Sequence, residues 1–585
     1  MKKLPPWPSA ALLPLLLALL LLFNACAGDD DLLTDSVNYT AVISSSDTDV
    51  TFLDPSPPPD ADDDGSFADA VYDMGINEGL GRASVRPGYG TMYEVFVYSF
   101  YDSDGDGIGD LAGLTSQLDY ISELGFDGIW LMPIMPSTTY HKYDVVDYYD
   151  IDPEYGTLDD FKAFIAACDE RGIRVIIDLV INHTSSEHPL FIEACEYLTG
   201  LGAAEPDLAA CPAVEFYHFN RERVGKSYPV PGTEDWYYEA PFWSGMPDLN
   251  LGSAAVRDEI ENITRFWLDL GVAGFRIDAA KEFVSGDHAA NVEILRWFND
   301  MLKMVRPDAY IVAEVWDQAP VYAAYYESGI DSVFNFAFAG PSGTIKSTAD
   351  GSRPAENFGK SLAYLDELFG PHNPDYIDAP FYSNHDLDRA AGYYTGEHAA
   401  AQTKLALALN LLMSGNSFTY YGDELGMVGA GRDENKRVAM PWVDDPAAPG
   451  MCVGPADRQD FDMLYPSLER QIEDPYSIYN YFKNAVIVRR AFPEIIHGRS
   501  QNLDTIANST LAAFVKYDGD DSCVILANLS PNETSIDTAA LNTELTTLVS
   551  TPVSDIAALL VTDDSSVICT AGTLTLPGHG IVVLK

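Results

Sequence analysis

Basic residues are scarce in this chain. Its 585 residues include 34 Lys and Arg against 89 Asp and Glu, which gives a formal net charge of −55 at pH 7. Nucleic-acid binding is excluded as a main function because phosphate recognition needs clustered positive charge. Electrostatic docking on anionic lipid is excluded for the same reason, whereas an uncharged sugar chain is not repelled. The acidic excess favours solubility, and adaptation to high salt, which screens self-repulsion, is the alternative.

Long apolar runs are missing, apart from one near the N-terminus. Residues 12–23 are almost wholly apolar, but they include Pro14 and are fewer than the roughly 20 that cross a bilayer. Two lysines precede them and a cysteine follows. This order resembles a bacterial lipoprotein signal peptide (residues 1–25), in which Cys26 becomes the lipidated N-terminus. The resemblance implies export to the cell envelope, periplasmic or at the outer surface, with membrane contact only through this anchor. Ordinary secretion is the alternative.

Cysteine is infrequent, with seven in the whole chain. The six that follow Cys26 can pair in an exported protein. We expect one disulfide between Cys195 and Cys211, which would close a short loop, and a second between Cys523 and Cys569. No cysteine pair has the spacing of zinc ligands, so a structural zinc site is not expected.

The composition changes along the chain. Residues 26–85 are rich in Asp, Ser, Pro and Gly, which predicts a flexible acidic spacer. Beyond it, eight short apolar runs alternate with helical patterns, which is typical of an α/β fold with buried parallel strands. They predict a (β/α)8 TIM barrel over residues 86–184 and 248–493. We expect a small inserted domain B at 185–247, after the third strand, and a C-terminal all-β sandwich domain at 494–585.

Polar side chains gather where four of these runs end. They are Asp178, Asn182, His183, Arg276, Asp278, Glu314, Asn384, His385 and Asp386. In a TIM barrel the active site lies at the carboxyl ends of the strands. A single acid there is usually a solvated loop residue or a helix cap, but four such ends together indicate a site. A pair of carboxyl groups with a third anion suits retaining glycoside hydrolysis, because its transition state is oxocarbenium-like.

Motifs at these strand ends carry a family resemblance. They are DLVINH (178–183), GFRIDAAKE (274–282), AEVWD (313–317) and FYSNHD (381–386), with GIWLMPI (128–134) and MPDLN (246–250) in addition. From about residue 85 to the end, the chain resembles the α-amylase family of glycoside hydrolases. Within the family it is similar to members intermediate between oligo-1,6-glucosidases and neopullulanases.

The resemblance implies a catalytic role for three carboxyl groups. Asp278 would be the nucleophile, and Glu314 would be the general acid and base. Asp386 would bind sugar hydroxyls and distort the reacting ring, while Arg276 would orient Asp278 and keep it ionised.

The resemblance also implies substrate contacts. They are Tyr143, Asp144, His183, Arg276, Lys281 and His385. Tyr143 would stack under the reacting sugar, and Lys281 would lie beyond the cleaved bond. Asp144 recognises the chain end in exo-acting relatives, but it also occurs in endo-acting ones. Trp236 and Trp243, in the inserted segment, could either stack on sugar or pack in a core.

A bound calcium ion is expected near the first strand. The segment DSDGDGIGD (102–110) alternates Asp with small residues, as oxygen-rich calcium loops do, but it lacks the terminal Glu of an EF-hand. It resembles the calcium loop of oligo-1,6-glucosidase-like family members. The implied ligands are Asp102, Asp104, Asp106, the Ile108 carbonyl and Asp110. An acidic turn without metal is the alternative. The second calcium site of α-amylases is not expected in its usual form, because Glu282 replaces a histidine there.

The predicted function is that of an α-amylase, cleaving internal α-1,4 bonds of an α-glucan polysaccharide or maltooligosaccharide as a monomer. In this family, Ala279 after the nucleophile and the MPDLN motif favour that specificity. Alternatives are a neopullulanase or cyclomaltodextrinase, an α-glucosidase or a glucanotransferase. A more distant alternative is an inactive surface protein that only binds glucan.

Overall fold

The computed structural model describes residues 67, 70–76, 86, 88–202 and 204–585. The predicted signal peptide, Cys26 and most of the predicted spacer lie outside the described residues. Among the helices described, none is long and apolar enough to cross a membrane.

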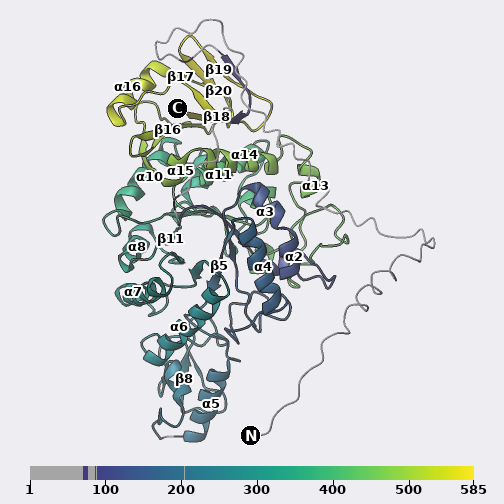
Figure 1. Ribbon diagram of the computed structural model, residues 1–585, viewed down its shortest axis with the longest axis vertical. Coiled ribbons are helices and arrows are strands. Elements are labelled where there is room, and N and C mark those ends of the chain that lie inside the picture. The colour runs from purple at the N-terminus through teal and green to yellow at the C-terminus, as the bar shows by residue number, and fades with distance from the viewer. Residues whose placement is uncertain (1–66, 68–69, 77–85, 87, 203) are drawn as a thin grey trace, which may run out of the picture. The chain divides into compact units, whose positions relative to one another are not determined.

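Eight parallel strands form the predicted barrel. Their order in the sheet is β12-β11-β10-β9-β5-β4-β3-β13, and a parallel bridge between Phe381 and Phe418 joins the last strand to the first. Figure 1 shows helices on the outside of these strands. The strands are β3 (Thr91–Val95), β4 (Gly128–Leu131), β5 (Arg174–Leu179), β9 (Gly274–Ile277), β10 (Tyr310–Ala313), β11 (Ser332–Asn335), β12 (Ala379–Pro380) and β13 (Ser417–Tyr420).

Helices of the barrel region follow or connect these strands. They are α2 (Leu111–Ser116), α3 (Leu118–Leu124), α4 (Leu158–Glu170), α6 (Ala254–Asp269), α7 (His288–Val305), α8 (Ala319–Ala323), α9 (Thr344–Ala349), α10 (Glu356–Phe369), α11 (Ala399–Leu411), α12 (Asp433–Lys436), α13 (Leu468–Gln471), α14 (Ile478–Ala491) and α15 (Pro493–His497). The sequence supplies local start signals. Thr157, for example, forms a capping box with Asp160 at the start of α4.

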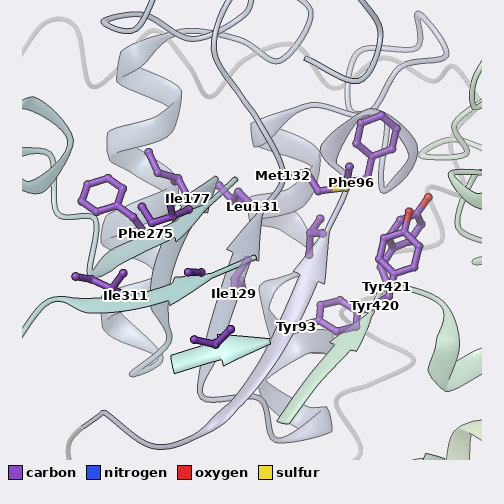
Figure 2. Packing of buried hydrophobic residues seen from close by; sticks show 14 of the residues in the cluster. Tyr93, Phe96, Ile129, Leu131, Met132, Ile177, Phe275, Ile311, Tyr420 and Tyr421 are labelled. Atoms are coloured by element: carbon purple, nitrogen blue, oxygen red, sulfur yellow. The ribbon is translucent and has the colours of Figure 1, made fainter. Parts of the chain in front are cut away.

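Alternate residues of each strand face opposite sides of the barrel wall. One set packs under the surrounding helices, and Figure 2 shows Ile129, Leu131, Ile177, Phe275 and Ile311 from it. The other set fills the barrel interior, and it includes Met92, Trp130, Ile176, Tyr310, Val312, Phe334 and Phe418. Glu94, Asp178 and Glu314 each lie two residues after a member of this inner set, namely Met92, Ile176 and Val312. Their side chains are therefore on the same, inner side of the barrel wall. The fold therefore places these polar groups on top of the apolar interior.

The segment predicted as domain B contains one helix and a small antiparallel sheet. These elements are α5 (Pro189–Leu201), β6 (Phe219–Asn220), β7 (Ser227–Pro229) and β8 (Tyr237–Glu239), with sheet order β6-β8-β7. Bridges between His183 and Asp248, and between Tyr217 and Leu249, tie the segment to the end of β5. Domain B is thus anchored directly beside the strand-end motifs.

The C-terminal region packs two sheets together. The six-stranded sheet runs β14-β15-β16-β21-β18-β2 and the four-stranded one β1-β19-β20-β17. One helix, α16, interrupts the all-β pattern: Asp537 caps its start, and Leu541 and Leu545 are buried on one face. The remaining elements are β14 (Arg499–Asn502), β15 (Leu511–Asp518), β16 (Asp521–Asn528), β17 (Thr534–Asp537), α16 (Thr538–Leu548), β18 (Ile556–Leu560), β19 (Val567–Thr570), β20 (Thr573–Leu576) and β21 (Ile581–Leu584).

Part of the predicted spacer belongs to these sheets. Strands β1 (Ala70–Tyr72) and β2 (Gly75–Ile76) pair antiparallel with β19 and β18. The expectation of a spacer up to residue 85 is therefore wrong for residues 70–76. The physical reason is a local apolar cluster: Phe67 and Tyr72 are buried in the core between the two sheets.

Neither expected disulfide forms among the described residues, because Cys195, Cys211 and Cys523 are free, buried thiols. Cys523 belongs to the core that β16 shares with the barrel, whereas Cys569 lies in the core between the two C-terminal sheets. Cys211 instead places its sulfur 3.9 Å from Glu193 Oε1. The expectation of disulfides is therefore wrong: Cys523 and Cys569 lie in different cores, and Cys195 and Cys211 share one apolar core as unbonded thiols.

Candidate active site

Strand register brings the predicted acids together. Asp178 pairs with Arg276 across β5 and β9. Backbone bonds extend the ladder by one residue, because the N–H of Asp278 donates to Leu179 O (3.3 Å) and that of Glu314 to Ile277 O (3.0 Å). Asp278 and Glu314 therefore lie side by side at the end of two neighbouring strands.

Arg276 is the centre of this group and is 1% exposed. Its Nη1 donates to both carboxylate oxygens of Asp178 (2.8 and 3.0 Å) and to Asp278 Oδ1 (2.6 Å). Its Nη2 lies 3.0 Å from Glu314 Oε2. Burial lowers the pKa of Arg276, but Asp178 and Glu314 outweigh it and hold that pKa well above its ordinary value. One permanently charged guanidinium thus fixes three carboxyl groups.

Glu314 is set up to carry a proton. Burial raises the pKa of its carboxyl group, and this outweighs Arg276, which lowers it, while Asp278 and Asp386 raise it further. Its Oε2 also accepts the backbone N–H of Ala279 at 3.0 Å. Ala279 has a φ of 44°, an uncommon conformation for a residue with a side chain. Such strain persists where the surrounding contacts impose it, and here one of those contacts reaches Glu314.

Asp386 is held in the opposite state. Its Oδ2 lies 3.1 Å from His385 Nε2, and its Oδ1 lies 3.1 Å from Nη2 of Arg437. Burial raises the pKa of Asp386, but His385 and Arg437 outweigh it and hold that pKa well below its ordinary value. Two carboxyl groups at one site therefore have their pKa values driven apart, which separates a proton donor from a permanent anion.

Tyr143 links the two sides of the group. Its hydroxyl donates to Asp178 Oδ2 (2.9 Å) and lies 2.8 Å from His385 Nε2. The ring stacks on His385 with centroids 5.4 Å apart and planes 17° from parallel. The structure brings Tyr143 to the predicted site, with one ring face already covered by His385.

His183 has an unsatisfied ring nitrogen. Its Nε2 is buried and has no hydrogen-bond partner among the described residues. Burial lowers the pKa of His183, which keeps the ring neutral. The ring packs against Phe242, with centroids 5.1 Å apart. A buried nitrogen without a partner is costly unless a ligand or water binds it, so His183 is suited to receive a sugar hydroxyl.

The predicted substrate contact at Asp144 is not supported. Asp144 is 0% exposed, and its carboxylate accepts hydrogen bonds from Ser137 Oγ (2.5 Å), Thr138 N (3.3 Å) and Ser185 Oγ (3.3 Å). Burial raises the pKa of Asp144, but the hydroxyl donors, Ser137 first, lower it overall. The carboxylate holds the loop after β4 against the start of domain B and leaves no surface for a sugar. This corrects the prediction.

Lys281 lies at the rim of the site. Its Nζ is 2.9 Å from Asp317 Oδ2 and donates to Trp316 O at 2.9 Å. Trp316 is 47% exposed and stacks on Phe336, with centroids 5.3 Å apart. An exposed aromatic face beside a cation can contact a sugar, and Trp316 was not predicted from the sequence.

The structure separates the two tryptophans of domain B. Trp236 is 4% exposed, with the Arg221 guanidinium 3.7 Å from its ring centroid. Trp243 is 43% exposed. Core packing therefore applies to Trp236, while the ring of Trp243 is available to a ligand.

The acidic loop after β3 gathers three carboxylates. Asp102, Asp104 and Asp106 each place an oxygen within 4.8 Å of the others. Asp102 also accepts the N–H groups of Gly105 (2.6 Å) and Gly107 (2.8 Å). Asp110 lies outside this group and caps α2, accepting Gly113 N–H at 2.7 Å. Oxygen donors on a glycine-rich loop fit a hard cation such as Ca²⁺.

Asn182 and Glu282 occupy the positions expected for the second calcium site of α-amylases, and each forms a hydrogen bond with another side chain. Asn182 donates to Asp248 Oδ1 at 3.2 Å, and Glu282 accepts from Ser285 Oγ at 3.1 Å. Neither joins the three carboxylates of the loop after β3.

Comparisons with known proteins agree with this geometry. The α-amylase catalytic-domain model matches residues 94–498. Alpha-amylase 3 of Dictyoglomus thermophilum is 37% identical over 445 residues, which cover 75% of this chain and 84% of that protein. The 4-alpha-glucanotransferase of Thermotoga maritima is 30% identical, over 75% of this chain and 96% of its own.

A solved structure gives the same result. Eubacterium rectale Amy13B has 45% sequence identity and a TM-score of 0.84, covering 88% of this chain and 99% of its own. The residues matched by the family model include seven of the eight barrel strands in full, the end of β3 and each strand-end motif described above. This chain therefore belongs to the α-amylase family of glucan-acting enzymes.

Proposed function

We propose that the protein is a retaining α-amylase that cleaves internal α-1,4 bonds of starch and related glucans. The observation that carries this proposal is the pairing of Asp278 and Glu314 on one guanidinium, with Asp386 held as an anion nearby. A retaining glycosidase needs one carboxylate nucleophile and one carboxylic acid close together. Ala279 and the relative named alpha-amylase support the α-1,4 specificity.

In the proposed mechanism Asp278 attacks the anomeric carbon while Glu314 gives its proton to the leaving oxygen. The raised pKa of Glu314 supports the acid role. Glu314, now ionised, then takes a proton from the water that attacks the same carbon and releases Asp278. Asp386 and Arg276 supply fixed charges, which need no reorganisation as the oxocarbenium-like charge develops.

A glucanotransferase is the second candidate, favoured by the Thermotoga maritima relative. Both activities use one glycosyl-enzyme and differ in the acceptor, which is water or another sugar. The product pattern from soluble starch, maltotriose and pullulan separates them. Rapid viscosity loss of starch with mixed maltooligosaccharides supports the amylase, whereas the conversion of maltotriose into longer products supports transfer. Glucose released one unit at a time would contradict both and indicate an α-glucosidase.

We propose that Asp102, Asp104 and Asp106 bind Ca²⁺, with the Ile108 carbonyl as a further ligand. The bound ion would neutralise three clustered carboxylates and stabilise the loop. The loop contacts the segment after α12, since Asp102 N–H donates to Gly450 O (3.1 Å) and Val453 N–H donates to Gly107 O (2.8 Å).

Chelation with EDTA is expected to lower the melting temperature by a few degrees, because a ligand bound only by the folded state stabilises it. An Asp104→Asn, Asp106→Asn double variant should lose this response in differential scanning calorimetry. An Asp159→Asn, Asp169→Asn double variant on α4 is the matched control and should keep it. A melting temperature that is unchanged by chelator in the wild type would contradict the calcium proposal.

We also propose that the protein is an exported lipoprotein anchored through Cys26. The support is the order of basic, apolar and small residues before that cysteine. A Cys26→Ala variant is expected to move from the membrane fraction to the soluble exported fraction. Equal membrane association of wild type and variant would contradict the anchor.

A further inference from the structure

Glu94 is a buried acid that the catalytic scheme does not use. It lies on β3 with 1% exposure, one layer above the apolar barrel interior. Its Oε1 lies 2.6 Å from His385 Nδ1, and the side chains of both residues are 1% exposed. A buried carboxylate without a charged partner would be strongly unfavourable. This pairing therefore accounts for how the fold tolerates Glu94.

Both ring nitrogens of His385 face acceptors. Nδ1 faces Glu94, and Nε2 faces Asp386 Oδ2 at 3.1 Å. Neutral imidazole has one N–H donor and one nitrogen lone pair, so it can donate to only one of two carboxylates. Imidazolium donates to both. The positions of the two carboxylates therefore fit the imidazolium form of His385.

Other charged groups also act on His385. The hydroxyl of Tyr143 lies 2.8 Å from Nε2, and Asp178 from β5 interacts with the ring electrostatically. Arg437 donates from Nε to the backbone carbonyl of His385 at 3.2 Å and repels the ring charge. Arg276, bonded to Asp178, is the second nearby cation. Trp130 meets the ring edge-on and carries no charge.

We propose that Glu94 is a positioning residue that holds His385 as imidazolium, so that His385 fixes the ionised Asp386 and orients Tyr143 at the sugar. Glu94 does not touch substrate and acts only through His385. Burial lowers the pKa of His385, but Asp386 and Glu94 outweigh it and raise the pKa to about 9. Because the folded-state pKa is raised, the imidazolium persists through neutral pH and is lost only as the pH rises through that value.

The Glu94→Gln variant tests this directly. It keeps the side-chain shape and removes one of the two charges beside the ring, so the pKa of His385 should fall by about 1–3 units. The titration of the His385 ring, followed by NMR, should shift down by the same amount. A merely structural role for Glu94 would lower activity and leave that titration unmoved.

Glu424→Gln is the matched control. Glu424 is also a fully buried barrel acid, but it accepts from Tyr93 (2.5 Å) and Tyr120 (2.7 Å) and has no contact with His385. Its variant should leave the His385 titration where the wild type has it. An unmoved His385 titration in a folded Glu94→Gln variant, or an equal shift in both variants, would overturn the proposal.

The role of Glu94 rests on the proposed glucan cleavage, but the NMR measurement does not depend on it. The ring signals of the ten histidines can be followed by NMR in the free, full-length wild type, with His385 assigned from a His385→Asn variant. The signal of His385 should remain that of imidazolium to about pH 8. Titration near the ordinary value of about 6.5 would overturn the inference, even if Glu94→Gln failed to fold. Absence of glucan cleavage would instead contradict only the proposed function.

Discussion

An Asp278→Asn variant is expected to lose at least about 10⁴-fold in kcat/KM on maltooligosaccharides, because an amide cannot form the glycosyl-enzyme. The fold should survive. Arg276 keeps its contacts to Asp178 and Glu314, so its buried charge remains paired. Steady-state kinetics and a thermal melt of the purified variant measure both effects.

Asp423→Asn is the control for replacing a buried acid in the same barrel. Asp423 accepts from Ser383 Oγ at 2.6 Å, and burial raises its pKa to about 7. It touches none of Asp278, Glu314 and Asp386 through the bonds described, so its variant should stay within a few-fold of wild type. An Asp278→Asn enzyme with comparable activity would show that the nucleophile is another residue.

Glu314→Gln is expected to lower glucan hydrolysis by about 10²- to 10⁴-fold, because the leaving oxygen is no longer protonated. An α-maltosyl fluoride has a leaving group that needs little protonation, so its glycosyl transfer to Asp278 should be affected much less. The glycosyl-enzyme should then accumulate, since no base activates water. Its mass is the measurement, taken on the intact protein after brief mixing.

Added azide distinguishes the loss of the Glu314 acid and base from a general loss of structure in the Glu314→Gln variant. As a charged nucleophile it needs no general base, so it should displace Asp278 from the anomeric carbon and give the α-maltosyl azide. The wild type and the Glu424→Gln control should give no such product. If azide leaves the rate of Glu314→Gln unchanged and no intermediate accumulates, Glu314 is not the acid and base.

The barrel was predictable because its signals are local and repeated. Seven of the eight apolar runs contain a strand, and β12 ends directly before the remaining run at 381–386. Strand parity alone places Asp178 and Glu314 above the interior that Trp130 and Tyr310 fill. The carboxyl ends of parallel strands meet at one edge. Residues that are far apart in the sequence therefore become neighbours by a rule that needs no side-chain detail.

The supporting contacts were not predictable in the same way. Arg437 follows the short helix α12, and nothing in its local sequence indicates that it reaches Asp386. Glu94 sits in an apolar run and finds His385 only when the barrel closes. For Asp144 the sequence pattern predicted a substrate contact, but in the structure its carboxylate accepts hydrogen bonds from hydroxyl groups of Ser137 and Ser185 instead. Such roles depend on tertiary geometry.

The errors outside the site have a similar cause. The composition of residues 26–85 predicts a spacer on average, but a few apolar residues are enough for β1 and β2 to join the edges of the C-terminal sheets. The expected disulfide between Cys523 and Cys569 fails because sequence does not say which side of a sheet each thiol faces. The average composition of a segment does not reveal short strands within it, and an even number of cysteines does not reveal which way each thiol points.

The central claim is that Asp278 and Glu314 cleave α-glucans with retention of configuration. Proton NMR of the wild type acting on maltohexaose observes the new reducing end before it mutarotates. We expect the α-anomer to appear first and the β-anomer to grow in only as equilibrium is reached. Initial release of the β-anomer would contradict a glycosyl-enzyme on Asp278.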